Sequence, residues 1–212
     1  GSIVARGTRS GMYEIWTDVD GIYSADPRIL PRAQPVPEIT YLEMSELSYF
    51  GAHAVHPLAL FPTGQADIPM VILNTKNPDA KGTLIVPNGV SPVRPREVVG
   101  VAGRRGFIVV RVDKALMNIE VGIAHTILGV FRNRGISIEH SPSGMDTMSI
   151  VIDGKHLPEA LTKEVSKEVC EACRADKVRI ERNLSVIAAV GSGMKHHVGM
   201  AAALFGALAD AG

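Results

Sequence analysis

Residues 16–28 read Trp-Thr-Asp-Val-Asp-Gly-Ile-Tyr-Ser-Ala-Asp-Pro-Arg, a strand end followed by a polar turn and a loop. The residues up to Trp16 favour a strand, Asp20-Gly21 favours a turn, and Asp26-Pro27 favours an extended bend. Open α/β sheets bind their ligands beyond the carboxyl ends of their strands. The run therefore predicts an α/β fold with a ligand-binding edge at this point.

Four side chains of this run carry groups suited to a nucleotide, namely a hydroxyl, a carboxylate, a flat ring and a planar guanidinium: Thr17, Asp18, Tyr23 and Arg28. In the alternative interpretation, Asp18 and Asp20 cap the turn and Arg28 pairs with Asp26. The spacing of the residues leaves both interpretations open.

The next segments continue the α/β pattern. Thr40 and Glu43 form a capping box, which predicts a helix from about Tyr41 to Phe50 that stops at Gly51. A second helix is expected from Pro57, with His56 as its cap rather than as a catalytic base. A strand is expected at 70–73.

Residues 87–96 contain three prolines and no apolar periodicity, so we predict a linker there, after a first domain over residues 1–86. Beyond it, strands are expected at 107–112, 136–139 and 148–152. Apolar positions at helical spacing predict two helices. The first ends at Gly135 and has its apolar face at Ile123, Ile127, Val130 and Phe131. The second is a covering helix with its apolar face at Leu157, Leu161, Val165 and Val169.

The second part of the chain repeats itself. Met117, Gly122 and Gly135 recur 77 positions later as Met194, Gly199 and Gly212. We therefore predict two copies of one β/α unit, at 97–183 and 184–212. Since the second copy stops at Gly212, we expect it to be truncated and to need a partner chain at its sheet edge.

Composition excludes several classes of function. The chain has 22 basic and 22 acidic residues, so no excess positive charge favours nucleic acid or an anionic membrane as a partner. No apolar run reaches the roughly 20 residues that a membrane helix needs, and a signal peptide is not evident, so a cytoplasmic location is expected. Cys170 and Cys173 are expected to be reduced thiols, and His196-His197 lacks further ligands for a metal.

A family resemblance strengthens the nucleotide interpretation. Residues 49–57 read Tyr-Phe-Gly-Ala-His-Ala-Val-His-Pro, and Asn74-Thr75 and Gly82-Thr83-Leu84-Ile85 follow. Together with residues 16–28, these motifs resemble the later half of the aspartokinase catalytic domain, which has the amino-acid kinase fold. The resemblance implies phosphorylation of aspartate by ATP, with Mg²⁺, and carries nucleotide contacts to Thr17, Asp18, Tyr23, Arg28 and His53. His53 stands where many aspartokinases have lysine.

Two motifs of that family are not found in these residues: the Lys-Phe-Gly-Gly motif and the Gly-Gly-Ser-Asp segment that helps to bind aspartate. The resemblance therefore assigns no catalytic residue to this chain. We expect the parent protein to be an aspartokinase, and the 212-residue chain to be catalytically silent alone, with no tightly bound cofactor.

Segments 136–153 and 190–212 resemble ACT domains, the ferredoxin-like regulatory modules of aspartokinases. The resemblance implies a homodimer through these units and an effector amino acid, lysine first and threonine second. Its expected contacts are Met117, Asn118, Val121, Gly122, Ile123, Ser137, Glu139 and Asp146. Three alternatives stay open: ordinary solvated charges at Glu139 and Asp146, a free-standing amino-acid sensor with a vestigial kinase segment, and a different amino-acid kinase.

Overall fold

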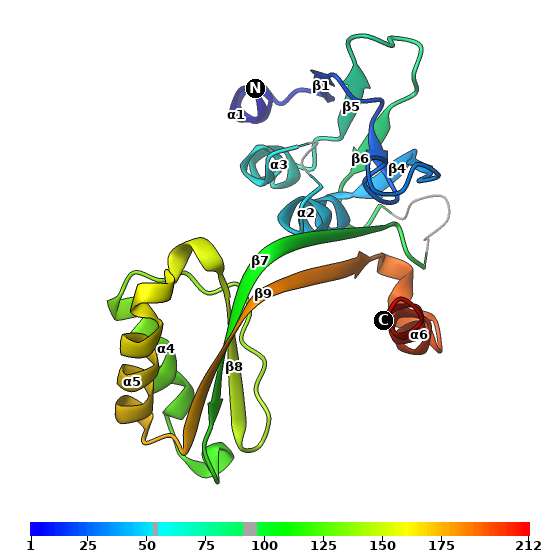
Figure 1. Cartoon of the computed structure of the whole chain (residues 1–212). Helices are drawn as coiled ribbons and strands as arrows, with labels where there is room; N and C mark the ends of the chain where they lie inside the picture. Colours follow the sequence, from blue (N-terminus) through cyan, green and yellow to red (C-terminus); the bar gives the residue numbers. More distant parts are fainter. Residues whose placement is uncertain (53–54, 91–96) are drawn as a thin grey trace. The chain divides into compact units, whose positions relative to one another are not determined.

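The structure is a computed structural model that describes residues 1–52, 55–90 and 97–212. The chain divides into two compact units (Figure 1). The first unit consists of Gly1–Gly103 and Ile187–Gly212, and the second unit consists of Arg104–Val186. Part of the predicted linker, residues 91–96, lies outside the described residues.

The first unit is built on a four-stranded sheet of order β1-β5-β6-β4. Its strands are β1 (Tyr13–Thr17), β4 (Glu38–Thr40), β5 (Met70–Asn74) and β6 (Thr83–Val86), and a small second sheet pairs β2 (Ile22–Tyr23) with β3 (Pro35–Val36). β1 pairs with β5, and β4 with β6, in parallel, whereas β5 and β6 are antiparallel. The helices are α1 (Ser2–Gly7), α2 (Tyr41–Tyr49) and α3 (Pro57–Gly64).

The local signals in this unit are confirmed. Thr40 and Glu43 form the expected capping box at the start of α2. His56 caps α3, because its Nδ1 accepts a hydrogen bond of 3.2 Å from the Leu58 N–H. The core lies where α2 meets the sheet, with Met44 and Leu47 packed in one cluster with strand residues such as Ile72.

The second unit contains most of a three-stranded sheet of order β8-β7-β9. Its elements are β7 (Gly100–Asp113), α4 (Ile123–Asn133), β8 (Thr147–Asp153), α5 (Thr162–Cys173) and β9 (Lys177–Val190). Helices α4 and α5 cover one face of the sheet (Figure 1). The core beneath them is formed by alternate strand residues and the apolar helix faces, including Val110, Ile150, Phe131, Val165 and Val169.

Two expected elements differ from the structure. Residues 136–139 form no strand; they run beside β8 with an isolated bridge between His140 and Val151. Pro142 accepts a hydrogen bond from the Ser149 N–H but has no N–H to return, which interrupts a regular ladder. The predicted covering helix begins only at Thr162, because Pro158 disfavours helical backbone at Leu157, whose φ and ψ are −131° and 79°.

Secondary-structure elements recur along the chain at the same separation of 77 residues as the sequence motifs. Strands β7 and β9 each have 14 residues, and both bounds of β9 lie 77 positions after those of β7 (177 and 100, 190 and 113). Helix α6 (Met200–Asp210) likewise lies 77 positions after α4 (200 and 123, 210 and 133). Gly122 and Gly199, which precede the two helices, have matching left-handed φ angles of 85° and 92°.

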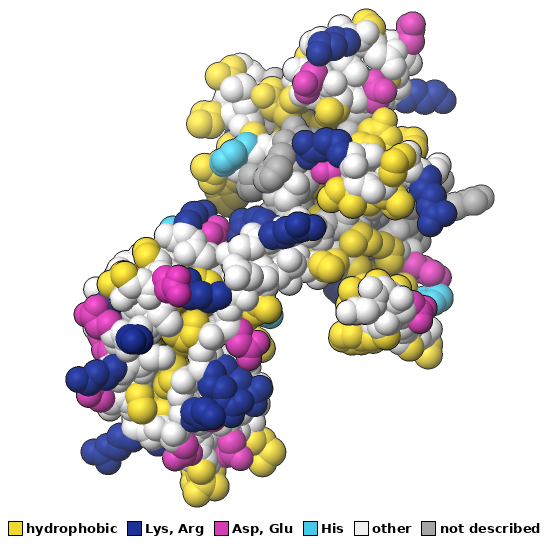
Figure 2. Space-filling view, in the orientation of Figure 1, with side chains coloured by type: hydrophobic (Ala, Val, Ile, Leu, Met, Phe, Trp, Pro, Cys, Tyr) yellow, Lys and Arg dark blue, Asp and Glu magenta, His cyan; other side chains and the backbone are white. Residues whose placement is uncertain are grey.

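The two copies differ in how much of the helix is buried. α4 buries four apolar side chains, at Ile123, Ile127, Val130 and Phe131, whereas α6 buries none. Hydrophobic side chains gather on the surface of α6 in Figure 2, and Phe205 and Leu208 are both exposed. The second copy therefore has an apolar helix without the cover that its counterpart receives.

Candidate functional site

The predicted ligand-binding run begins at the carboxyl end of β1, as expected. Thr17 is the last residue of that strand, and its carbonyl oxygen accepts hydrogen bonds from the Thr75 N–H at 2.8 Å and the Thr75 hydroxyl at 2.9 Å. The Thr17 hydroxyl lies 3.3 Å from the carboxylate of Asp18, which is exposed. Both polar groups thus stand at a strand end that the neighbouring loop holds in place.

Asp20 joins the turn after β1 to the loop after β5. Its Oδ1 accepts hydrogen bonds from the side-chain amides of Asn74 at 2.7 Å and Asn77 at 3.1 Å. Sequence analysis gave Asp20 only the role of a turn cap. Its two partners lie more than 50 positions away, so the sequence carried no local signal of this link.

Thr83 fixes the segment that carries Tyr23. The Thr83 side chain is fully buried in β6, and its Oγ1 accepts a hydrogen bond from the Ile22 N–H at 2.7 Å and donates one to the Val36 carbonyl at 2.6 Å. Gly21 passes so close that a Cβ there would lie 2.5 Å from the Thr83 oxygen. One buried hydroxyl therefore ties both strands of the small β2-β3 sheet to the main sheet.

Arg28 is paired within the run. Its guanidinium forms two-pronged hydrogen bonds with Asp26, the shortest 2.7 Å, while 83% of its side chain remains exposed. The hydrogen bond to Asp26 and its charge raise the pKa of Arg28. The pairing considered in the alternative interpretation is thus present, and a phosphate at this position would share Arg28 with Asp26.

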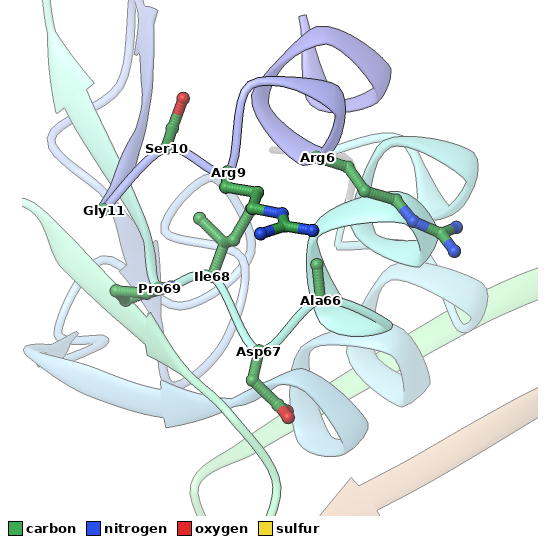
Figure 3. A pocket seen from close by; sticks show the side chains of 8 residues that line it. All are labelled: Arg6, Arg9, Ser10, Gly11, Ala66, Asp67, Ile68 and Pro69. Carbon is green, nitrogen blue, oxygen red and sulfur yellow. The ribbon is translucent and has the colours of Figure 1, made fainter.

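Two cavities in the described part of the chain lie away from this run. One of about 500 Å³ is lined by residues that include Arg6, Arg9 and Asp67 (Figure 3). Helices α1 and α3 both end beside it, so its arginines stand where positive charge stabilises helix carboxyl ends. The other, of about 340 Å³, lies between α2 and α3. Neither cavity is lined by any of the four run residues with nucleotide-suited side chains.

The fifth residue expected at the nucleotide, His53, lies outside the described residues. In the sequence it follows α2, and the last described residues before it are Gly51 and Ala52.

The expected effector residues fall into two groups. The first group surrounds the turn between β7 and α4: Met117, Asn118, Val121, Gly122, Ile123 and Asp146. Asp146 holds this turn, because its Oδ1 accepts a hydrogen bond from the Leu116 N–H at 2.8 Å. The Asn118 N–H donates to the Met145 carbonyl at 3.0 Å. Val121 is fully exposed, whereas Met117 and Ile123 are buried.

The second group, Ser137 and Glu139, follows the other end of α4. That helix has 11 residues, which corresponds to about 16 Å at 1.5 Å per residue. Glu139 forms an ion pair of 3.1 Å with Arg104, whose guanidinium also lies 4.6 Å from the centre of the Phe107 ring. Within one chain, the second unit therefore does not bring Glu139 and Asp146 together. Sequence analysis did not identify Arg104.

The remaining polar candidates have structural partners. Cys170 and Cys173 lie on α5 as thiols without a disulfide, and they donate hydrogen bonds to the carbonyl oxygens of Ala175 and Val169, respectively. Burial raises the pKa of Cys173. The Nδ1 of His197 lies 2.6 Å from a carboxylate oxygen of Glu97. Among the described residues, no group of three or more His, Cys, Asp or Glu side chains is arranged to hold a metal. No helix within the described ranges is long and apolar enough to span a membrane.

The first part of the chain is similar in sequence to amino-acid kinases. The model of the amino acid kinase family matches residues 1–74. Aspartokinase 3 of Bacillus subtilis is 39% identical over 211 residues, which cover 100% of this chain and 46% of that protein. The bifunctional aspartokinase/homoserine dehydrogenase of Haemophilus influenzae is 36% identical over 93% of this chain and 24% of that protein.

Solved structures agree with the sequence matches. The aspartate kinase of Clostridium acetobutylicum superposes with a TM-score of 0.90 at 38% identity, over 99% of this chain and 48% of that chain. E. coli aspartokinase III in complex with aspartate and ADP superposes with a TM-score of 0.80 at 27% identity, over 98% of this chain and 46% of that chain. The chain belongs to the aspartokinase family, and the expected α/β fold class is confirmed. It spans about half the length of the two aspartokinases it superposes on.

Proposed function

We propose that the protein carrying this sequence transfers the γ-phosphate of ATP to the side-chain carboxylate of aspartate. The supporting observation is the run from Thr17 to Arg28 at the carboxyl end of β1, in a chain that matches aspartokinases over its whole length. A structural relative from E. coli was solved with aspartate and ADP.

The residues present fit the nucleotide part of such a site. Asp20 and Thr83 hold the run against the loop after β5 and against β6. This support leaves the exposed Arg28 guanidinium free to approach a phosphate while it keeps Asp26 as its partner. Tyr23, half-buried on β2, offers a ring for stacking. ATP, as its Mg²⁺ complex, supplies the phosphoryl group.

We also propose that the 212 residues do not catalyse the transfer alone. They contain neither the Lys-Phe-Gly-Gly motif nor the Gly-Gly-Ser-Asp segment. Phosphoryl transfer depends on positioning and charge stabilisation, so a nucleotide contact without an acceptor pocket gives no turnover. The expected result is nucleotide binding without aspartyl phosphate formation.

For regulation, we propose an end-product amino acid as effector, with lysine as the first candidate. E. coli aspartokinase III has been solved with lysine and aspartate. The turn before α4 offers backbone N–H groups to a carboxylate, because Gly122 has no side chain to cap the helix. Within one chain, this turn and Glu139 lie at opposite ends of α4. An effector that contacts both groups therefore needs two copies of the chain, which favours a homodimer.

The chain's single tryptophan provides the test of nucleotide binding. Trp16 precedes Thr17 and is half exposed. We expect ADP with Mg²⁺ to change its fluorescence in a saturable manner. Arg28→Gln should raise the dissociation constant of ADP about tenfold. Arg32→Gln, an equal change of charge at an exposed neighbour, should leave the dissociation constant unchanged. Equal behaviour of the two variants would argue against the proposed phosphate contact.

Calorimetry with lysine, threonine and methionine tests the regulatory proposal separately. We expect lysine to give heat of binding and methionine to give none. Absence of heat from all three amino acids would count against an effector site in this chain.

A further inference from the structure

A buried carboxylate links α2 to the loop after β9. Glu43 is 3% exposed, and its two oxygens have different partners. Oε2 accepts hydrogen bonds from the Thr40 N–H at 3.0 Å and hydroxyl at 2.9 Å, which is the capping box of α2 itself. Oε1 accepts a hydrogen bond of 2.7 Å from the Ser192 N–H, 149 positions along the chain. A single side chain thus holds both the helix and the distant loop.

The same loop is fixed to the residues that lead into β7. The Val99 N–H donates to the Val190 carbonyl at 2.7 Å, and His197 pairs with Glu97. At Gly191 a Cβ would lie 2.2 Å from the Glu97 carbonyl oxygen, so this approach requires glycine. Several contacts therefore fix the loop to the rest of the first unit, to which it belongs.

The internal repeat shows which feature of this contact is particular to the second copy. The amide equivalent to Ser192 is that of Ala115, 77 positions earlier (192 and 115). The Ala115 N–H also donates to a carboxylate, Oδ2 of Asp176, at 2.7 Å. In the first copy that carboxylate belongs to Asp176, which directly precedes β9 and lies in the second unit with Ala115, whereas in the second copy it comes from α2 of the first unit. The loop position is preserved, and its partner has changed.

Helix α2 and the proposed nucleotide-binding run, Thr17 to Arg28 (the nucleotide run), both contact the short segment Gly100–Val101. The Val101 N–H donates to the Ser24 carbonyl at 2.8 Å, and Ser24 lies between Tyr23 and Arg28. Gly100, its neighbour, lies against the Leu47 side chain of α2, since a Cβ there would approach that side chain to 3.2 Å. A chain of direct contacts therefore runs from the Ser192 loop through α2 and Val101 to the run.

We propose that Glu43 is a positioning residue that couples the loop of the second repeat to the nucleotide run. When the Ser192 N–H leaves Glu43, the first turn of α2 loses one of its two fixed points, and the segment Gly100–Val101 loses part of its support. The nucleotide end of the link rests on the proposed function, whereas the mechanical link from the loop to α2 does not.

The test removes one hydrogen bond and leaves the capping box intact. Ser192→Pro deletes the N–H donor. The backbone suits proline, because Ser192 is the first residue of a short 3₁₀ helix and Gly191 before it is extended. The proline Cδ also takes the place of the hydrogen and so pushes Glu43 Oε1 away from the loop. Ser192→Ala keeps the N–H and removes only the hydroxyl, which also acts on Glu43, so the difference between the two variants reports the N–H. Hydrogen exchange without ligand is measured on the amides of α2, with the β5 amides as an internal reference.

We expect Ser192→Pro to accelerate exchange in α2 and at the Val101 amide about tenfold, with β5 unchanged and Ser192→Ala much closer to the parent chain than Ser192→Pro. Unchanged exchange in α2, or equal acceleration in α2 and β5, would overturn the proposal. If Ser192→Pro does not fold, His197→Gln loosens the same loop from its exposed side and should give the same pattern at about threefold.

An ADP titration of the same variants separates the two proposals. A Trp16 response that weakens in Ser192→Pro but not in Ser192→Ala supports coupling to the nucleotide run. A response that is equal in both restricts Glu43 to a structural role and overturns the coupling. If the parent chain gives no response to ADP, the proposed function fails, and hydrogen exchange still decides whether the loop and α2 are linked.

Discussion

Replacement of Thr83 by valine tests whether one buried hydroxyl holds the run from Thr17 to Arg28 in place. Valine keeps the shape and the strand preference of threonine. It removes the oxygen that accepts from the Ile22 N–H at 2.7 Å and donates to the Val36 carbonyl at 2.6 Å. Two buried polar groups then lose their partner, at about 1–3 kcal/mol each. We therefore expect the free energy of unfolding to fall by about 2–6 kcal/mol.

Urea denaturation followed by Trp16 fluorescence measures this change in the unit concerned. The matched control is Thr75→Val. The Thr75 hydroxyl bonds the Thr17 carbonyl at the surface, where its own N–H remains bonded to the same oxygen. Its cost should stay below about 0.5 kcal/mol. If Thr83→Val were no more destabilising than Thr75→Val, the anchoring role of Thr83 would be refuted.

Three further predictions concern other parts of the molecule. Phe131→Ala, at a fully buried position of the second unit, should cost about 3–5 kcal/mol in urea denaturation followed by circular dichroism; a cost below 1 kcal/mol would contradict the packing. Asp20→Ala should weaken ADP binding about fivefold, because the amides of Asn74 and Asn77 lose their acceptor; unchanged affinity in the fluorescence titration would exclude Asp20 as a support of the site. Burial opposes ionisation of Glu43, but hydrogen bonds from Thr40 and Ser192 outweigh it and lower its pKa. Its stabilisation should therefore be fully present above the unfolded value, about 4.3, and be lost as pH falls through the lower folded value. Denaturation of Glu43→Gln between pH 3 and 6 should lack this component, and a parallel pH dependence in parent and variant would disprove it.

Local signals in the sequence predicted the local elements correctly. The capping box at Thr40 and Glu43 gave the start of α2, and His56 before Pro57 gave the start of α3. Each signal lies within a few residues of the structure it determines. The segment 136–139 has strand-forming residues but no strand, because pairing depends on the partner and on Pro142 beyond it.

The supports of the site could not be predicted, because their partners lie far apart in sequence. Thr83 is 61 positions from Ile22, and Glu43 is 149 positions from Ser192. Arg104 pairs with Glu139 across 35 positions. Threonine, glutamate and arginine at these places have many ordinary roles, so the residue type alone does not reveal the contact. The repeat of 77 residues was visible because equivalent residues recur at a fixed separation.

The most direct test of nucleotide binding at the Thr17–Arg28 run is chemical-shift mapping of the isotopically labelled chain with ADP and Mg²⁺. We predict that the largest amide shifts fall in residues 17–28 and in the adjoining loop at Asn74–Thr75. Shifts centred instead on the cavity of Arg6 and Arg9, or no shifts at millimolar ADP, would contradict the assignment of this run to the nucleotide.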